Sequence, residues 1–371
     1  MGTRAESVKP GDLGPDDLAL WRTWHMAGHG LDSPFLSPGF ALAIARVRPH
    51  CEVAVFEDDQ GIAGFLPFER HGSGVARAIG LSVSDCQGVV HRPGVRLSPA
   101  DMLEAASLSV FEFDHLLAAQ IPEDGRDAIR VGSPVMDLGQ GYAAYRDARR
   151  ALTKSAIGSV ERKDRKLGRE HGELRLEYGS RDPAMLRLMM TWKSAHYRRT
   201  GASDRFTWPW VKQLVEESFE QSFEETGREY GGLLSVLYAG DTPVAVEFGL
   251  RSATVYERWF GSYDADAFGQ YSPGLVMLLR FAQAAAADGL TTIDLGKGGE
   301  PYKEFFASSH IPLAEGWMSR PSVRSALYRA WHAPPRAARA FVKSHPELRR
   351  RARETRDSIN RVRRYGFGAD R

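Results

Sequence analysis

The apolar positions along the chain follow two periods, one typical of strands and one typical of helices. Between residues 242 and 306 the two periods alternate, which predicts a strand hairpin, a helix, a short strand and a final helix. These predicted elements are the strands Val244–Leu250 and Thr254–Phe260, the helix Leu275–Asp288, the strand Thr291–Leu295 and the helix Tyr302–Phe306. Because a helix connects two strands there, the stretch predicts an α/β plan in which ligands bind at strand ends and helix N-termini.

The rest of the chain predicts the same kinds of element in a loosely similar order. Before residue 242 the helical candidates are Asp16–His29, Pro38–Val47, Pro99–Ser109, Tyr142–Glu170, Pro183–Thr200 and Trp208–Phe223. The strand candidates are Glu52–Phe56, Ile62–Phe68, Arg77–Leu81, Gln87–Val90, Phe111–Leu117, Leu174–Tyr178 and Gly231–Tyr238. No repeated sequence accompanies the repeated order. We therefore predict α/β structure with mixed sheets in two domains, residues 1–150 and 151–319.

Composition adds few constraints to this picture. The chain has 371 residues, of which 43% are hydrophobic and 26% charged, as is typical of globular proteins of two domains. Cys51 and Cys86 lie far apart without CxxC or Cys/His spacing, so we expect neither a disulfide framework nor a metal site. No apolar run resembles a signal peptide or reaches the ~20 residues of a membrane span. These features favour a cytoplasmic location.

The net charge of +2 conceals a strongly basic C-terminal segment. Residues 320–371 contain fifteen Lys or Arg and four Asp or Glu, a local balance of +11, so the preceding residues carry −9. Two basic helices are predicted there, Pro321–Val342 and Pro346–Arg364, and together they form a basic helical tail. Such a tail favours an anionic partner, for example an inner-membrane surface that it contacts peripherally, although a solvated helical surface has the same composition.

Several segments together resemble one family of transferases. They are PFLSPGFALAIARVRPHCEVAVFEDDQGIAGFLPFER, WKSAHYRRTG, YERWFGSYDADAFGQYSPGLVMLLRFAQAAAADG and IDLGKGGEPYKEFF. These segments resemble the BioF2-like, CelD-type acetyltransferases of the GNAT superfamily, which are relatives of the Fem-type aminoacyltransferases. The resemblance runs from about residue 30 to residue 318, and its most specific part is the YD…YSPG…IDLG…YK series. Hydrolase, zinc-protease and NTPase motifs of the GxSxG, HExxH and Walker types are absent.

The resemblance implies tandem GNAT-like acyltransferase domains that use acetyl-CoA and an amino or hydroxyl acceptor. Members are often associated with bacterial exopolysaccharide synthesis, including cellulose-linked and holdfast-type polymers. We therefore expect an N-acetyltransferase acting on an amino sugar or a lipid-linked sugar precursor. The usual pyrophosphate loop, Arg/Gln-x-x-Gly-x-Gly/Ala, is absent, and residues 270–274 replace it only in part. The donor therefore stays open between acetyl-CoA and aminoacyl-tRNA, with tRNA the less favoured partner.

Candidate donor-binding residues lie at two glycine-containing turns. Ser272 and Gly274 open the predicted helix around Pro273, where free backbone N–H groups suit a pyrophosphate, although a simple capped helix start has the same residues. In the second turn, Lys297 is a weaker phosphate ligand, and Gly298 allows close backbone approach.

Four residues are the candidates for catalysis. Lys303 occupies the position of the family's Tyr-Lys pair, where it can neutralise charge that develops on a phosphate or thioester oxygen. By analogy with GNAT tyrosines, Tyr302 is the candidate to protonate the leaving thiolate. Glu247 interrupts an apolar strand and is either a general base or the partner of Arg258 in a structural ion pair. Asp264 either holds the acceptor or forms a turn.

Four further residues are candidates for contact with the acceptor. Tyr256 alternates with Arg258 on the second strand of the hairpin, and Tyr263 ends that strand. Trp259 either stacks on a sugar ring or packs in the core. Asp294 is expected to orient Lys303 or to cap the following loop, and His196, with Tyr197 beside it, is a weaker candidate for a base.

In a third hypothesis the protein has lost catalysis. The GNAT fold would then serve as an effector or scaffold whose tail binds cyclic di-GMP, a ligand that the holdfast-type relatives suggest. The arginines that would clamp its phosphates are Arg349, Arg350, Arg351, Arg353 and Arg356.

Overall fold

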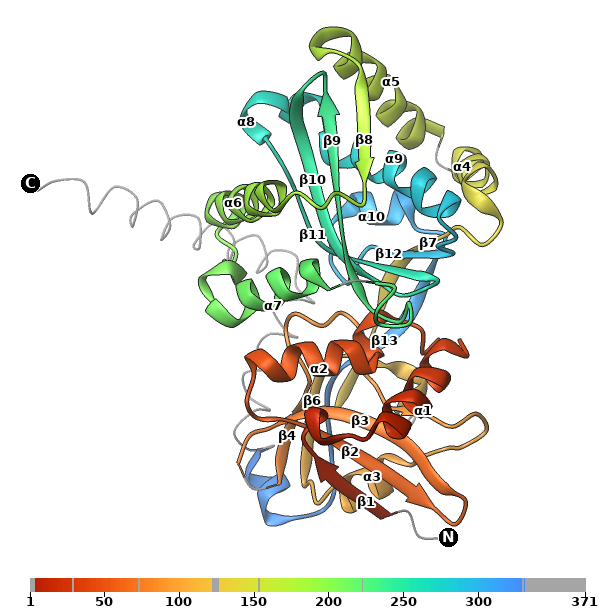
Figure 1. Ribbon diagram of the computed structural model, residues 1–371, viewed down its shortest axis with the longest axis vertical. Coiled ribbons are helices and arrows are strands. Elements are labelled where there is room, and N and C mark those ends of the chain that lie inside the picture. The colour runs from red at the N-terminus through yellow and green to blue at the C-terminus, as the bar shows by residue number, and fades with distance from the viewer. Residues whose placement is uncertain are drawn as a thin grey trace, which may run out of the picture.

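The computed structural model describes residues 4–28, 30–72, 74–121, 127–152, 154–221, 223–328 and 330. One continuous mixed sheet of thirteen strands runs through both halves of the chain. In Figure 1 the N-terminal half lies below and the C-terminal half above, with helices on both faces of each. The fold class is therefore mixed α/β, as the sequence predicts.

The strands follow one another across the sheet in an order that differs from their order in the chain. From the N-terminal edge the order is β1 (Arg4–Val8), β2 (Cys51–Asp58), β3 (Gly61–Arg70), β4 (Val75–Ala78), β6 (Val110–Leu117), β13 (Ser309–Ser319), β7 (Ala128–Asp137), β12 (Thr292–Asp294), β11 (Val255–Tyr263), β10 (Thr242–Arg251), β9 (Gly231–Ala239) and β8 (Leu174–Tyr178). The short β5 (Val90–His91) pairs with β3 off this path.

The two halves exchange one strand each. Strand β7, from the first half of the chain, pairs with β12, and β13, from the end of the second half, pairs with β6. The exchanged strands also pair with each other and join the halves. The halves then show the same plan, since each contains one parallel pair, β4–β6 or β11–β12, among antiparallel neighbours. The predicted boundary near residue 150 stays a prediction, because the sheet itself is continuous.

The helices pack on both faces of the sheet. They are α1 (Pro15–Met26), α2 (Pro38–Val47), α3 (Pro99–Ala105), α4 (Gly141–Leu152), α5 (Lys154–His171), α6 (Pro183–Thr200), α7 (Pro209–Glu220), α8 (Ala265–Phe268), α9 (Pro273–Ala287) and α10 (Pro301–Phe306). Short 3-10 turns occur at Pro10–Asp12, Pro34–Leu36, Ala118–Gln120, Arg205–Thr207 and Gly269–Tyr271. In the C-terminal half, α4, α5 and α9 share one core with the sheet, and α6 and α7 share another on the opposite face.

Helix α9 anchors the larger of these two cores. Its apolar residues, among them Val276, Leu278 and Phe281, are buried against β10 and β11. Pro273 at its first turn needs no hydrogen-bond partner for an N–H, and Gly289 after its last turn adopts a positive φ of 87°. The sequence signals for this helix therefore coincide with its boundaries.

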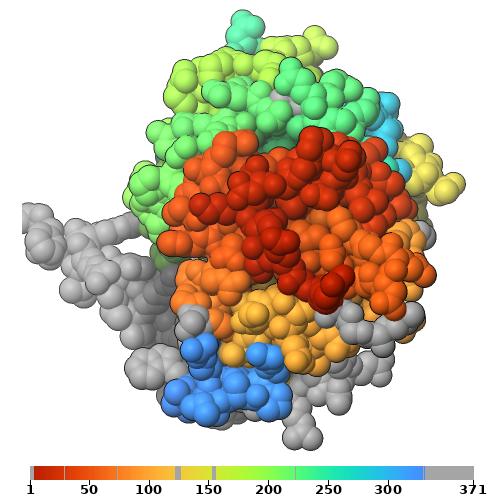
Figure 2. Space-filling view, turned by 60° about the horizontal axis from the view of Figure 1, so that its bottom comes forward, coloured from red at the N-terminus to blue at the C-terminus, as the bar shows by residue number. Residues whose placement is uncertain are grey.

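The segment after β13 returns to the N-terminal half. Arg320 N–H donates to the Ser109 carbonyl, and residues 323–328 are helical. Figure 2 shows this blue segment at the edge of the face that the first segments of the chain cover. The predicted helix Pro321–Val342 is described only to residue 330, and Pro346–Arg364 with its arginines lies outside the described residues. Along the part of the chain that is described, no helix is both long and apolar enough to cross a membrane.

Candidate active site

A bulge in strand β11 creates the local geometry of the candidate site. The register between β10 and β11 shifts around Gly249, so that Leu250 pairs with Glu257 but Phe248 pairs with Phe260. Two residues, Arg258 and Trp259, therefore lie opposite the single residue Gly249. A Cβ atom on Gly249 would lie 2.3 Å from the Glu257 carbonyl oxygen, so this bulge requires glycine.

The parallel pairing of β11 with β12 ends at the same level. Only Val255–Glu257 pair with Thr292–Asp294, after which β12 stops and Gly296, with a φ of 74°, turns the chain away. Strand β11 continues to Tyr263 without this neighbour. An opening therefore forms beside the second half of β11, at the carboxyl ends of two parallel strands, where α/β folds commonly bind ligands.

A cavity of about 340 Å³ occupies this region. Helix α6 forms one wall, strands β10 and β11 form the floor, and the first turns of α9 and α10 contribute the rest. The lining residues are Lys193, His196, Arg199, Ala245, Val246, Glu247, Arg258, Gly261, Ser262, Tyr263, Ser272, Gly274, Leu275, Met277, Glu300 and Tyr302. Five predicted site residues, from both catalytic and binding groups, thus meet in one cavity: Glu247, Tyr263, Ser272, Gly274 and Tyr302.

A buried ion pair lies on the cavity floor. Arg258 Nε donates to Glu247 Oε1 at 2.5 Å, and Arg258 Nη1 donates to the Tyr302 hydroxyl at 2.9 Å. Glu247 is only 1% exposed. Burial alone would lower the pKa of Arg258, but the Glu247 carboxylate and Tyr302 outweigh it and raise that pKa. Of the two alternatives for Glu247, the ion pair is present, and a role as base stays a prediction.

Lys303 lies behind the cavity wall rather than in it. Its Nζ donates to the Gly296 carbonyl at 2.9 Å and lies 3.2 Å from Glu300 Oε2, while the side chain is buried. A Cβ on Gly298 would come within 2.2 Å of Glu300 and 2.9 Å of Lys303 Nζ. The glycine loop thus makes room for the Lys303–Glu300 pair. Glu300 connects this pair to the cavity, because it is one of the lining residues.

The N-terminus of α9 forms the opposite end of the cavity. Ser272 adopts the left-handed conformation, with φ of 50°, which costs a non-glycine residue on the order of 1 kcal/mol. Its hydroxyl accepts a hydrogen bond from Lys163 Nζ of α5 at 2.6 Å. At Gly274 a Cβ would meet the Tyr263 ring at 3.2 Å. A cation and a helix N-terminus therefore meet at this end.

Five other predicted site residues do not line the cavity. Tyr256 is buried against Phe281, at 4.4 Å between ring centroids. Trp259 Nε1 donates to the Val83 carbonyl, and Asp264 caps α8 through the N–H groups of its first turn. Asp294 accepts hydrogen bonds from Ser133 and from Gly296 N–H, so it caps the glycine loop. Lys297 donates to the Asp114 carbonyl and pairs with Glu315.

Helix α6 supplies three basic side chains that the sequence analysis did not select as a group. Lys193, His196 and Arg199 lie three residues apart in WKSAHYRRTG, so they share one helix face, and all three line the cavity. Burial and the nearby Arg258 lower the pKa of Lys193 to about 8. The spacing of three basic residues on one face of an otherwise amphipathic helix was the signal available in the sequence.

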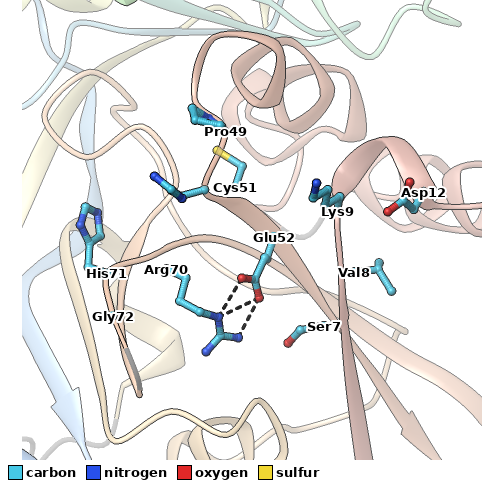
Figure 3. Close-up of a pocket in the computed structure, with 11 residues that line it drawn as sticks. Ser7, Val8, Lys9, Asp12, Pro49, Cys51, Glu52, Arg70, His71 and Gly72 are labelled. Carbon is cyan, nitrogen blue, oxygen red and sulfur yellow. Dashed lines mark hydrogen bonds and ion pairs between the residues drawn. The ribbon is translucent and has the colours of Figure 1, made fainter.

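A larger trough lies on the N-terminal half, far along the sheet from this cavity. It measures about 1090 Å³ and is bounded by the end of β1, the start of β2 and the end of β3. In Figure 3 its central charged groups, Arg70 and Glu52, face each other and are joined by hydrogen bonds of 2.7–2.9 Å. Because these charges satisfy each other, the trough offers less for chemistry than the smaller cavity. Among the residues described, no cluster of His, Cys, Asp or Glu has the arrangement of a metal site.

Comparisons with known proteins give the cavity a context. Residues 154–304 match the family model of the acetyltransferase (GNAT) domain. FemX is similar in structure at 9% identity, with a TM-score of 0.55, covering 84% of this chain and 96% of that chain. The C-terminal domain of an Agrobacterium fabrum protein named as a lysylphosphatidylglycerol synthetase gives 13% identity and a TM-score of 0.52, covering 84% of this chain and 94% of its own.

A conserved protein of unknown function from Bacteroides thetaiotaomicron VPI-5482 is similar to the same degree. It gives 12% identity and a TM-score of 0.52, covering 83% of this chain and 98% of that chain. At these identities the likeness concerns the fold, and it extends over both halves of the sheet. No curated protein matches the sequence. Since the matched residues include β8–β12, α6, α9 and every residue that lines the cavity, the second half of this chain carries a GNAT-type acyltransferase domain.

Proposed function

We propose that the protein transfers an acetyl group from acetyl-CoA to the amine of an amino sugar or a lipid-linked sugar. This sugar is a precursor of a cell-surface polysaccharide. The observation that carries the acyl transfer is the cavity at the bulge of β11, between the N-terminus of α9 and the basic face of α6. The sugar acceptor and the BioF2-like, CelD-type assignment rest on the resemblance of the YD…YSPG…IDLG…YK series.

The residues at the α9 end of the cavity suit a pyrophosphate-bearing donor. Ser272 and Gly274 present a helix N-terminus, and Lys163 adds a positive charge at 2.6 Å from the Ser272 hydroxyl. Acetyl-CoA would supply a thioester carbon that is open to attack by an amine. This end of the cavity therefore takes over the role that the missing Arg/Gln-x-x-Gly-x-Gly/Ala loop plays in other GNAT proteins.

The acceptor amine must lose a proton as it attacks. Glu247 is a constrained base, because the Arg258 guanidinium already compensates its charge. Tyr302, whose hydroxyl accepts a hydrogen bond from Arg258, is placed to return a proton to the leaving thiolate.

Lys303 acts in this proposal as a positioning residue. It fixes the Gly296 carbonyl and Glu300, and through them the loop between β12 and α10. We expect Lys303→Met to lower kcat by about 100-fold while the dissociation constant for acetyl-CoA changes less than threefold, because the change disturbs the wall of the cavity and not the α9 end. Stopped-time assays of CoA release and calorimetry measure the two quantities.

The direct test of the donor uses purified full-length protein. Calorimetry with acetyl-CoA should show saturable binding, and CoA should be released when glucosamine or another amino sugar is added. Lys212→Met is the matched control for Lys303→Met, since Lys212 is exposed on α7 and distant from the cavity lining. The proposal is contradicted if the protein does not bind acetyl-CoA and releases no CoA with any amino sugar.

One observation favours a second donor, aminoacyl-tRNA. Helix α5 exposes Arg162, Arg165, Lys166 and Arg169, and its Lys163 contacts Ser272 at the cavity. This basic face would follow a nucleic-acid backbone up to the site. A gel shift with tRNA that weakens steeply with salt, and that is lost when the four exposed residues are changed to Gln, would replace acetyl-CoA by tRNA in the proposal.

The effector hypothesis concerns residues outside the described part of the chain. Its test compares the full chain with a chain that ends after Ser319, in binding to cyclic di-GMP and to vesicles with anionic lipids. Unchanged binding of both would remove cyclic di-GMP and the membrane as partners of the tail. Loss of vesicle binding alone would assign the tail to peripheral contact with the inner membrane.

A further inference from the structure

The cavity holds more positive charge than its own carboxylates neutralise. Glu247 pairs with Arg258 at 2.5 Å, and Glu300 pairs with Lys303 at 3.2 Å. These two pairs use every carboxylate of the cavity lining. The ammonium of Lys193 and the guanidinium of Arg199 remain, and within the described chain no carboxylate lies within ion-pair distance of either.

Lys193 is held in place although it lacks a carboxylate partner. Its Nζ donates to the Gly261 carbonyl at 3.1 Å and lies 5.4 Å from the centre of the Tyr197 ring. Burial of the ammonium, with Arg258 nearby, lowers the pKa of Lys193, and the carboxylates of Glu247 and Glu300 offset this only in part. An anion bound in the cavity would stabilise the charged form, so the site favours an anionic ligand near Gly261.

His196 and Arg199 complete a set of donors on the same helix face. Arg199 Nη2 donates to His196 Nδ1 at 3.3 Å, so the ring proton of a neutral His196 lies on Nε2. Burial, Lys193 and Arg199 lower the pKa of His196, which keeps the ring neutral at pH 7. The face therefore offers an ammonium, a guanidinium and an imidazole N–H, a combination suited to phosphate or carboxylate oxygens.

The α6 face and the α9 end have separate sets of cations. Lys163 serves the N-terminus of α9, whereas Lys193 and Arg199 lie on α6, which packs on β10 and β11. If the α9 end holds the donor's pyrophosphate, as proposed above, the α6 face is left for the second substrate. We propose that the acceptor amine carries an anionic oxygen group, a phosphate or a carboxylate, which binds to Lys193, His196 and Arg199. This inference rests on the proposed function for its division of the cavity.

Inorganic phosphate tests the α6 face without knowledge of the acceptor. Calorimetry is carried out with the full-length protein, alone and with saturating CoA, for the wild type and for Lys193→Met and Arg199→Met. Arg187→Met is the control, because Arg187 is exposed on the same helix but does not line the cavity. We expect phosphate to bind with CoA present, and each cavity variant to weaken it at least tenfold, while the control stays within twofold.

The outcomes separate this inference from the proposed function. Competition between phosphate and CoA, no phosphate binding, or equal binding by Lys193→Met and the wild type would each overturn the inference. If CoA does not bind but phosphate binding still depends on Lys193, the anion site stands and the acetyl-CoA donor fails.

Competition between sugars and bound phosphate then distinguishes a phosphate group on the acceptor from a carboxylate group. Glucosamine 6-phosphate and muramic acid, which differ from glucosamine by a phosphate and a carboxylate, compete with bound phosphate in the same calorimeter. The acceptor class is the one whose sugar displaces phosphate from the wild type at a concentration at least tenfold below that of glucosamine. Displacement by all three sugars at the same concentration would contradict an anionic acceptor.

Discussion

The two halves of the sheet contain the same parallel strand pair but use it differently. In the N-terminal half, β4 and β6 pair over three residues each, and the segment after β4 then returns to β6. The Gln87 amide closes this region, since it donates to Asp114 and Ser84 and accepts from the N–H groups of Asp114 and His115. In the C-terminal half a cavity of about 340 Å³ lies beside the continuing part of β11 instead.

The difference shows how one plan provides both a support and a site. The buried glutamine accepts hydrogen bonds from the backbone N–H groups of Asp114 and His115 and fills the gap with its side chain. Beside the open position lie a bulge with its glycine and a buried ion pair between β10 and β11. Of the two halves with the same strand plan, the one that departs from regular strand pairing therefore contains the candidate site.

The ion pair between β10 and β11, Glu247–Arg258, and the ion pair between β4 and β6, Arg77–Glu112, should differ most in energy. Glu247→Gln leaves Arg258 charged and buried, so we expect a loss of about 3–5 kcal/mol in the free energy of unfolding. The matched change in the N-terminal half is Glu112→Gln, which breaks the pair with Arg77, a side chain 40% exposed, and should cost less than about 1 kcal/mol. Urea unfolding measures both values.

A double variant sharpens this result. Glu247→Gln with Arg258→Met removes both charges, so we expect it to recover most of the lost stability while CoA release stays undetectable. Similar losses for Glu247→Gln and Glu112→Gln would contradict the contrast between the halves.

Two glycines beside register shifts, Gly249 in β10 and Gly64 in β3, form the second pair. Gly249→Ala places a methyl group 2.3 Å from a backbone oxygen. We expect the free energy of unfolding to fall by roughly 3 kcal/mol and CoA release to be lost. Gly64→Ala in β3 meets the flexible Leu97 side chain at 3.0 Å and should cost roughly 1 kcal/mol. Thermal unfolding and CoA release are measured on both, and an active Gly249→Ala variant would argue against a bulge-dependent site.

Gln87 provides the reverse experiment on the N-terminal half. Gln87→Ala leaves buried N–H groups of Asp114 and His115 without their acceptor, so we expect a loss of about 2 kcal/mol. Because this region lies in the supporting half, kcat should stay within twofold. A large fall in kcat without a fall in stability would instead assign the closed region to catalysis.

The smallest effect concerns the charge of Lys193. Its pKa of about 8 lies below that of a free lysine, so the ammonium is present at pH 7 and is lost as the pH rises through 8. Sulfate, which stays fully ionised over this range, should therefore bind about tenfold more weakly at pH 9 than at pH 7. Lys193→Arg should abolish that decline, because the guanidinium stays charged. A decline of the same size in Lys193→Arg would show that another group titrates.

The same shift has a consequence for stability with the opposite sign. Between pH 8 and the pKa of an unfolded lysine near 10.4, the unfolded chain binds more protons than the folded one. The contribution of Lys193 therefore destabilises the fold fully below pH 8 and diminishes as the pH rises above it. This trend should be absent from Lys193→Met.

The sequence predicted the elements with clear periods and failed where pairing depends on distant partners. The run Val244–Leu250 is rich in strand-forming residues and forms β10, and the Ala-rich run before Gly289 forms α9. Strand β13 contains Pro312 and Gly316 and does not alternate, so neither it nor its exchange with β7 was predicted. The predicted helix Tyr142–Glu170 is instead two helices, because α4 ends at Leu152.

The candidate site shows the same limit. Motifs in the second half predicted where the cavity would lie, and five of the predicted site residues line it. On α6 the sequence analysis named His196 but missed Lys193 and Arg199, because their importance depends on how that helix packs on β11, which no local pattern records. Likewise, the burial of Lys303 behind Glu300 follows from a turn at Gly296 and not from the Tyr-Lys motif itself.

The strand exchange sets the order in which this protein can be completed during synthesis. Strand β7 leaves the ribosome early, yet both of its neighbours, β12 and β13, are translated only after residue 291. At typical rates of translation, β6 and β7 wait on the order of ten to thirty seconds with unpaired edges, a state in which strands can pair with other nascent chains. A chain cut between the halves would give two incomplete sheets, so we expect neither half to fold fully without the other.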